Sequence, residues 1–315
     1  MTQHHGTEPY ESERPQRKDS AFVRFARDYG WRAYAIPVLA VITIFLIFDV
    51  LRSPDEPALS TDQAARETQV SASEDQPAEQ ESKGPGPDPA QSPLSALAIE
   101  DLPPGSPYSE KGDGTYRVVG KPGMSAGEGE ESTMTFVVEI ENGVDTSAYG
   151  GDDAFASMVD ATLSDPRGWT NDSRFKFEHV GPDDDPEMRI QLTSVETTKE
   201  LCGANLGMET SCRTTLGGGN TVVVNEARWV RGAVPFQGDL GSYRQYLLNH
   251  EVGHGLGYAA HVPCGDDGEL APIMMQQTLS LNNSELFSID PTEVYPDDQK
   301  TCRANPWPYP RPNAQ

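Results

Sequence analysis

Residues 52–107 constrain the fold of this chain most, because they cannot form a packed domain. No aromatic residue occurs between Ser53 and Pro107, and the stretch is rich in Pro, Glu, Asp, Gln, Ser and Ala. Such a composition buries too little apolar surface to offset the entropy lost on ordering. We therefore expect a disordered Pro-rich, acidic linker at 52–107 and a folded domain at 108–315, which is long enough to bury a sizeable core.

An almost wholly apolar run, Tyr34–Leu51, precedes the linker. About 18 residues of helix extend roughly 27 Å, which is close to the thickness of a bilayer core. A cleaved signal peptide is one alternative, but the run is longer than the usual apolar part of a signal peptide and lacks a prompt cleavage site. A buried core helix is another, but the linker offers nothing to cover it. We therefore expect a transmembrane signal-anchor helix at 33–51.

Basic residues flank this apolar run unevenly. The bases on its N-terminal side include Arg17, Lys18, Arg24, Arg27 and Arg32, and only Arg52 and Arg66 follow it within twenty residues. The positive-inside rule then predicts a cytoplasmic tail at 1–32. The expected location is the cell membrane, crossed once, with the C-terminal domain on the extracytoplasmic side.

The formal net charge of the chain is −25. Such a chain repels phosphate backbones, so we exclude nucleic acid as a partner. The charge is typical of a solvated surface and would also favour cationic substrates.

The cysteines lie in the part of the chain that is predicted to be exported. They are Cys202, Cys212, Cys264 and Cys302. An even number of cysteines outside the cytoplasm predicts two disulfides, and four cysteines allow three pairings.

Apolar and β-branched runs in the domain predict strands at 115–120, 133–141, 174–180, 188–193 and 220–226. One helix is expected to run to about Leu163, capped by Asp152 or Asp153, and a second from about Leu240 to Gly257. The order of these elements predicts an α+β domain in which a mixed sheet packs beside the helices.

The segment NHEVGHGLGYAAH, at the end of the second predicted helix, carries the chemistry. His250 and His254 are four residues apart, so their side chains lie one turn apart on one face of that helix. This spacing lets both imidazoles bind one zinc ion, with Glu251 placed as the general base. Gly257 can end the helix in a left-handed turn and let the chain bring His261 back toward the metal.

An HExxH motif alone is only a hypothesis, because it also arises by chance. Here three of the six histidines of the chain fall within twelve residues. The alternative is a buried helix with two hydrogen-bonded histidines, which would desolvate two imidazoles and a carboxylate without a metal. We therefore favour a zinc site.

A catalytic zinc ion needs a third protein ligand and an open position for water. His261 is the expected third ligand. The alternatives are His179, in a predicted strand, and the acidic loop after Cys264, which contains Asp266, Asp267 and Glu269.

The motif resembles that of the metzincin zinc peptidases, H-E-x-x-H-x-x-G-x-x-H followed by a turn that contains Met. The segment PIMMQQ, which begins at Pro272, lies where that turn would be, and the resemblance implies that Met274 is the Met beneath the metal. This chain departs from the pattern in one respect. Its third His comes four residues after Gly257 instead of three, and Ala260 occupies the usual position.

A wider resemblance covers most of residues 108–311 and rests on DPRGW, LC, VVNEARW, YRQYLLNHEVGHGLG, APIMMQQT and NPWPYP. These segments are similar to a family of exported actinobacterial proteins that is described as a domain of unknown function and considered zincin-like. The resemblance implies a zincin-like, metzincin-like fold with an apparent one-residue insertion before His261. Together with proximity in the sequence, it implies the disulfide pairs Cys202–Cys212 and Cys264–Cys302.

We therefore expect a membrane-anchored, extracytoplasmic zinc metallopeptidase, in which Glu251 is the general base that helps zinc-activated water to hydrolyse peptide bonds. The expected partners are the membrane, through the N-terminal helix, and a protein or peptide substrate at the cell surface, with cell-wall peptides as one possibility. The alternative is a catalytically weak zincin-fold binding module at the cell surface. Glu251 argues against that alternative, because a module that only binds has no need of this carboxylate.

Overall fold

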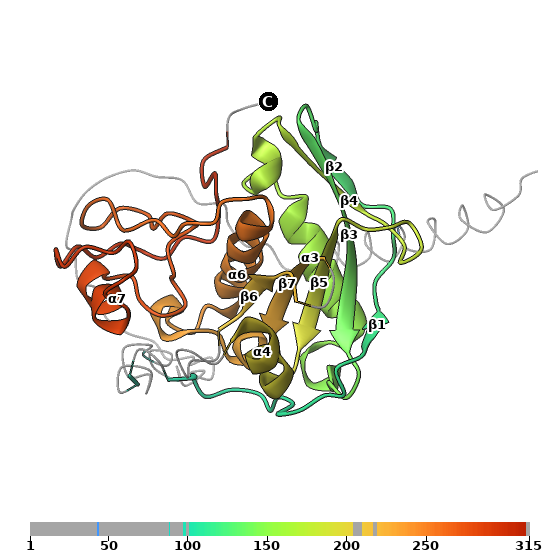
Figure 1. Cartoon of the computed structure of the whole chain (residues 1–315), viewed down its shortest axis with the longest axis horizontal. Coiled ribbons are helices and arrows are strands. Elements are labelled where there is room, and N and C mark those ends of the chain that lie inside the picture. The colour runs from blue at the N-terminus through green and yellow to red at the C-terminus, as the bar shows by residue number, and fades with distance from the viewer. Residues whose placement is uncertain are drawn as a thin grey trace, which may run out of the picture. The chain divides into compact units, whose positions relative to one another are not determined.

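The computed structural model describes residues 101–203, 210–216 and 219–312, together with residues 43, 88, 97 and 98. Within these ranges the chain forms one sheet of seven strands in the order β2-β4-β3-β5-β7-β6, with β1 beside β3 (Figure 1). The strands are β1 (Tyr116–Val118), β2 (Ser125–Gly127), β3 (Ser132–Glu141), β4 (Phe175–His179), β5 (Met188–Thr193), β6 (Cys212–Thr214) and β7 (Asn220–Asn225).

The sheet is mixed, as the sequence predicts. Strands β4, β3, β5 and β7 run parallel to one another. The short strands β1, β2 and β6 pair antiparallel with β3, β4 and β7. Parallel neighbours need a crossover connection, and helix α3 provides it between β3 and β4. The domain is therefore α+β, with β6 as the antiparallel strand at one edge.

Alternation along the central strands directs one set of side chains into the core. Phe136, Ile190 and Val222 are fully buried and belong to one apolar cluster with side chains of the main helices, such as Val159 and Leu247. Successive strand residues point to opposite faces of the sheet, so these three define the face that the main helices cover.

The helices are α3 (Asp152–Leu163), α4 (Val195–Cys202), α5 (Glu226–Arg231), α6 (Leu240–Gly255) and α7 (Asn283–Ile289), with single 3-10 turns at Ser147–Tyr149, Trp169–Asn171 and Val234–Phe236. The expected cap of α3 has to be corrected. Gly151 is the N-cap and makes no side-chain cap bond, while Asp152 is the first helical residue. The Asp152 carboxylate instead pairs with Arg117 at 2.8 Å and accepts a hydrogen bond from Thr146.

Helix α6 carries the HExxH motif and lies beside β7 (Figure 1). It begins with the Asp239 side chain accepting a hydrogen bond from the backbone N–H of Ser242, which satisfies one free donor of the first turn. Its apolar residues, among them Tyr243, Leu248 and Val252, are fully buried. The helix is therefore held on the sheet by the core and not by its ends alone.

The C-terminal region, residues 258–312, contains little regular structure. Besides α7 it has two isolated bridges, Leu270 with Arg303 and Asn282 with Thr301. A second, smaller apolar cluster includes Met275 and Leu286. This region packs as loops around side-chain contacts.

The transmembrane prediction has to be corrected. No helix among the described residues is both long and apolar enough to span a bilayer. The predicted tail (1–32), the span at 33–51 apart from Thr43, and most of the linker lie outside the described residues.

Candidate metal centre

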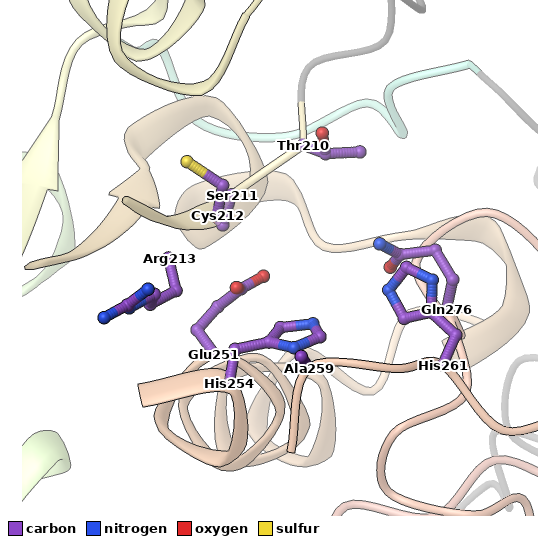
Figure 2. Close-up of a pocket in the computed structure, with 9 residues that line it drawn as sticks. All are labelled: Thr210, Ser211, Cys212, Arg213, Glu251, His254, Ala259, His261 and Gln276. Carbon is purple, nitrogen blue, oxygen red and sulfur yellow. The ribbon is translucent and has the colours of Figure 1, made fainter. Parts of the chain in front are cut away.

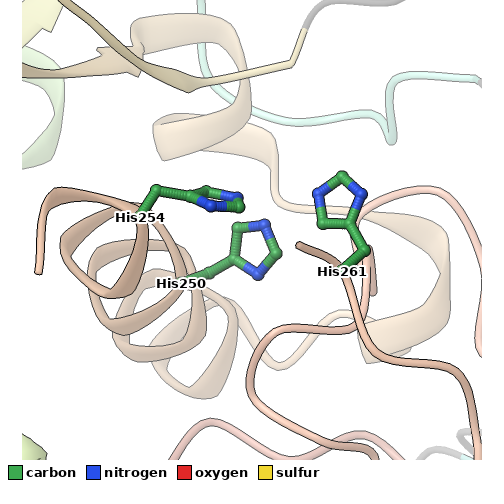
Figure 3. A group of neighbouring side chains, drawn as sticks. All are labelled: His250, His254 and His261. Carbon is green, nitrogen blue, oxygen red and sulfur yellow. The ribbon is translucent and has the colours of Figure 1, made fainter. Parts of the chain in front are cut away.

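Helix α6 places His250 and His254 on one face, one turn apart, as their spacing requires. Their ring centroids are 4.8 Å apart. His250 is almost fully buried and His254 is partly exposed. The two imidazoles project together from the last turns of the helix, as Figure 3 shows.

Each of these imidazoles is oriented by a backbone carbonyl. The Nδ1 atom of His250 lies 2.9 Å from the carbonyl oxygen of Ile273, and that of His254 lies 2.9 Å from the carbonyl oxygen of Tyr258. A carbonyl only accepts, so each Nδ1 carries the proton. Each Nε2 is then left with its lone pair, which is the form that binds a metal.

The chain reverses directly after the helix. The N–H of Tyr258 donates to the carbonyl of Gly253 and the N–H of Gly257 to that of His254, with Gly257 at φ 103°. This pair of bonds around a left-handed glycine is a Schellman motif. It turns the chain back toward the face of α6 that carries the two histidines.

His261 lies on the segment that follows this turn, next to the two histidines of α6. The N–H of Val262 donates to the carbonyl of Met274 at 3.1 Å, which fixes the backbone next to His261. The ring of His261 stacks on that of His250 at 5.5 Å, and its Nδ1 lies 3.3 Å from a carboxylate oxygen of Glu293. The extra residue is accommodated between Gly257 and His261, where Ala259 and Ala260 are exposed.

The three imidazoles converge on one point (Figure 3). One ligating nitrogen from each of His250, His254 and His261 lies within 4.8 Å of the others. The Nε2 atom of His250 is buried and has no hydrogen-bond partner. A buried nitrogen without a partner is unfavourable unless something binds it, so this donor set fits a metal ion.

The charge state of the histidines suits a metal. Burial, aided by the neighbouring His254, lowers the pKa of His250 to about 3. Burial and then the charge of His261 lower the pKa of His254. Both imidazoles are therefore neutral at neutral pH, and no proton has to leave them before a metal binds.

Glu251 lies beside the histidine cluster and is almost fully buried. Its carboxylate makes no hydrogen bond to any described residue and points into the pocket away from the helix (Figure 2). Burial raises the pKa of this carboxyl to about 8. A carboxylate with such proton affinity, next to a metal site, can accept a proton from water near neutral pH.

A cavity of about 380 Å³ opens in front of Glu251 (Figure 2). It is lined by Thr210, Ser211, Cys212, Arg213, Glu251, His254, Ala259, His261 and Gln276. Strand β6 forms one wall, and among the described residues it pairs only with β7. An unpaired strand edge therefore borders the same cavity as the histidines.

Met274 lies beneath the helix turn that joins the two histidines. A Cβ atom on Gly253 would come within 2.6 Å of the Met274 sulfur and 2.8 Å of Trp169. The carbonyls of Ile273 and Met274 accept from His250 and Val262, so this turn contacts both parts of the site. The turn thus connects α6 to the segment that carries His261.

The other candidates for a third ligand are not brought to the site. Asp266, Asp267 and Glu269 are exposed and outside the histidine cluster. His179 is buried on β4, where its Nδ1 lies 2.9 Å from Asp160. Its Nε2 also lacks a hydrogen-bond partner, so a buried unpartnered nitrogen alone does not define a metal site. Convergence with other ligands is what distinguishes His250.

Both disulfides join the expected cysteines. Cys202 pairs with Cys212 and fastens β6 to the end of α4, and Cys264 pairs with Cys302 across the C-terminal region. The Cα atoms are 5.7 Å and 5.6 Å apart. No other cysteine exists in the chain.

Sequence reasoning missed several residues around the site. Arg213 lines the cavity, Glu293 contacts His261, and Tyr258 orients His254. Arg213 and Glu293 lie more than 30 residues from the histidine that each approaches, so no local spacing could have indicated them. Tyr258 acts through its backbone, which its side chain does not predict.

Comparison with known proteins gives a family. The search of curated proteins and the search of solved structures found no match. A protein family described as "Protein of unknown function (DUF3152)" matches residues 102–310, which includes every strand, every described helix of the domain and all three histidines. The chain therefore belongs to the DUF3152 family.

Proposed function

We propose that this protein is an extracytoplasmic zinc metallopeptidase with a zincin-like, metzincin-like arrangement of sheet, active-site helix and Met turn. The observation that carries the proposal is the convergence of three imidazoles beside a buried carboxylate that makes no hydrogen bond to any described residue. Two disulfides support a location outside the cytoplasm, because such bonds persist in oxidising compartments.

Zinc is the proposed metal because of the donor set. His250, His254 and His261 offer three nitrogen ligands, which is typical of catalytic zinc sites that keep an open position. Imidazole also suits copper, iron and nickel, so the metal content of the purified protein tests this choice. When bound, a zinc ion would supply a Lewis acid that lowers the pKa of water and polarises a carbonyl group.

The residues of the chain would then position the reactants and move protons. The carbonyls of Ile273 and Tyr258 hold the Nδ1–H groups of His250 and His254, which keeps both Nε2 atoms directed at the metal. Glu251 would accept a proton from the attacking water and donate it to the leaving amine. Its burial excludes competing solvent and keeps its proton affinity high.

The edge of β6 with which no described strand pairs supports a peptide as the substrate. Ser211, Cys212 and Arg213 line the cavity along this strand. An exposed strand edge presents backbone N–H and C=O groups that an extended peptide can pair with. A peptide bound in this way would lay its backbone across the cavity that contains Glu251 and His254.

The first test combines metal analysis with a cleavage assay on the full chain. We expect the dialysed wild-type protein to retain about one zinc ion per chain by mass spectrometry, and to cleave members of a mixed peptide library. Glu251→Gln should still bind zinc, because Glu251 is not a ligand, but should lose two or more orders of magnitude in turnover as expected for the loss of a general base.

The outcomes separate the competing functions. If wild type and Glu251→Gln both bind zinc and neither cleaves any peptide, the protein is a zincin-fold binding module. Full activity in Glu251→Gln would refute the proposed mechanism. Failure of the wild type to hold any metal would refute the site itself.

A further inference from the structure

Among the described residues, Arg213 is the one arginine or lysine that lines the cavity. It lies on β6 directly opposite Val222 of β7. Residues opposite each other on paired strands share a face of the sheet, and Val222 belongs to the core under α6. The Arg213 side chain therefore projects to the side of the sheet on which the histidines lie, as Figure 2 shows.

A chain of hydrogen bonds and a neighbouring disulfide fix the position of Arg213. Its Nε donates to the Oδ1 of Asn220 at 2.7 Å, and the Nδ2 of Asn220 donates to the carbonyl of Gly255 at 3.0 Å. Gly255 directly follows His254 on α6, so a short chain of hydrogen bonds connects Arg213 to the helix of the site. The neighbouring Cys212 is fixed to α4 by a disulfide. Arg213 is exposed, and its hydrogen bond to Asn220 orients the guanidinium at the cavity.

No described carboxylate pairs with Arg213. Arg117, Arg167, Arg174 and Arg189 each form an ion pair with an aspartate or glutamate within 4.0 Å. Within the described part of the chain, the two terminal nitrogens of Arg213 make no hydrogen bond. Among the described residues, the guanidinium of Arg213 therefore has terminal N–H groups at the cavity that a ligand can bind.

Arg213 lies at the β6 end of the cavity. The opposite end of the cavity differs, because His261 there contacts the carboxylate of Glu293. Among the described residues, the cavity therefore has a cationic side chain at one end and the contact of His261 with Glu293 at the other, which would orient an asymmetric ligand.

We infer that Arg213 binds a carboxylate of the peptide substrate at the β6 end of the cavity, so that the enzyme selects peptides with an anionic group beside the cleaved bond. The inference rests on the proposed function. Arginine suits this role because its planar guanidinium holds a carboxylate through two parallel hydrogen bonds. The carboxylate belongs either to an Asp or Glu side chain or to the C-terminus of the peptide.

The experiment measures binding separately from cleavage. The full chain carrying Glu251→Gln, loaded with zinc, is titrated by calorimetry with octapeptides of alanine and leucine. One set carries a single Glu at each position in turn, a matched set carries Gln, and both sets are made with a free or an amidated C-terminus. We expect at least one carboxylate peptide to bind about tenfold or more tightly than its neutral counterpart, as is typical of a charge-assisted pair.

The Arg213→Gln change in the same background should abolish this preference, and Arg213→Lys should restore only part of it. The matched control is Arg311→Gln, an exposed arginine away from the cavity, which should leave the preference unchanged. Zinc affinity and circular dichroism of Arg213→Gln should equal those of its background, which excludes misfolding as the cause.

The arms of the experiment separate the sources of the carboxylate and the possible failures. Loss of the preference on amidation identifies the C-terminus, and loss on Glu-to-Gln exchange identifies a side chain. If wild type cleaves peptides but neither exchange changes binding, or if Arg213→Gln keeps the preference, the inference is wrong and the proposed function stands. If zinc-loaded protein neither binds nor cleaves any of the peptides, the proposed function falls, and the inference falls with it.

Discussion

Helix α6 and the C-terminal region both supply imidazoles to the histidine cluster, but they hold them by different means. His250 and His254 sit on a helix of regular backbone hydrogen bonds that the main core buries. His261 sits on a loop in a region with one short helix and two isolated bridges. The two positions on α6 follow from helical periodicity, whereas that of His261 depends on individual contacts.

Side-chain amides provide many of those contacts. Asn283 bonds both the N–H and the C=O of Cys264, at 2.9 Å and 3.1 Å. Gln277 donates to the carbonyls of Pro272 and Asn305 and accepts from the N–H of Asn305. These amides replace the ladder of a strand or helix. The proposed metal centre would therefore combine two ligands held by a helix in the core with one ligand held by contacts of single side chains.

The largest expected effect comes from removing a ligand from either region. His250→Ala and His261→Ala should each weaken zinc affinity by orders of magnitude, because a catalytic zinc site needs three protein ligands. Competition with a chelator of known affinity measures this. Asp266→Asn and His179→Ala are the controls and should bind zinc like the wild type. Zinc binding by His261→Ala at wild-type strength would show that the C-terminal region supplies no ligand.

The two disulfides should also differ in how much they contribute to the stability of the domain and to zinc binding. Replacing Cys264 and Cys302 by Ser should lower the free energy of unfolding by about 2–4 kcal/mol and also weaken zinc binding, because the bond stabilises the region that carries His261. The pair spans 38 residues, whereas Cys202 and Cys212 are only 10 apart. Removing the shorter link should therefore have the smaller effect on stability and little effect on zinc affinity.

Denaturant unfolding with and without zinc, run on both double variants, measures these differences. Equal losses of stability, together with unchanged zinc affinity in the Cys264 and Cys302 variant, would mean that the C-terminal region does not depend on its disulfide to hold His261.

The smallest expected effect concerns Glu293. Its contact with the Nδ1 of His261, at 3.3 Å, orients the ring in the way that the carbonyls of Ile273 and Tyr258 orient the other two. Loss of such a partner typically weakens metal affinity by about 10–100-fold, and we expect the lower end because Glu293 is exposed. Glu293→Gln is measured by chelator competition against Glu269→Gln, an exposed glutamate that does not contact the cluster. Equal zinc affinities in the two variants would show that Glu293 does not contribute to metal binding.

The same difference between the regions governs how far the sequence could predict the structure. The strand predicted at 188–193 is β5 with the same bounds, and the strand predicted at 133–141 is β3 with one more residue. Both have long β-branched or apolar runs. Strand β6 has only three residues, and helix α5 only six, too few for a periodic pattern. The C-terminal region follows from amide contacts between distant residues, which no periodicity reveals.

For the candidate site, the motif indicated the three histidines and Glu251 because their spacing is local, and the resemblance to the metzincins indicated Met274. Arg213 and Glu293 depend on tertiary contacts, and the sequence contains no signal for them. The prediction of the N-cap of α3 was wrong for a related reason. Asp152 or Asp153 was expected to cap the helix, but Gly151 is the N-cap and Asp152 pairs with Arg117, which lies 35 residues away.

The segment between Gly257 and Val262 is fixed at both ends, since the Schellman motif holds its start and the bond from Val262 to Met274 holds its finish. The residues between these two points are exposed, so the packing of the domain does not fix how many of them there are. A definition of this type of metal site by a fixed count between the second and third histidine would therefore exclude proteins that have the same geometry. The Schellman motif at Gly257 and the hydrogen bond from Val262 to Met274 define the proposed site better than a residue count does. Related chains could have a longer or shorter segment here and still keep the proposed third ligand.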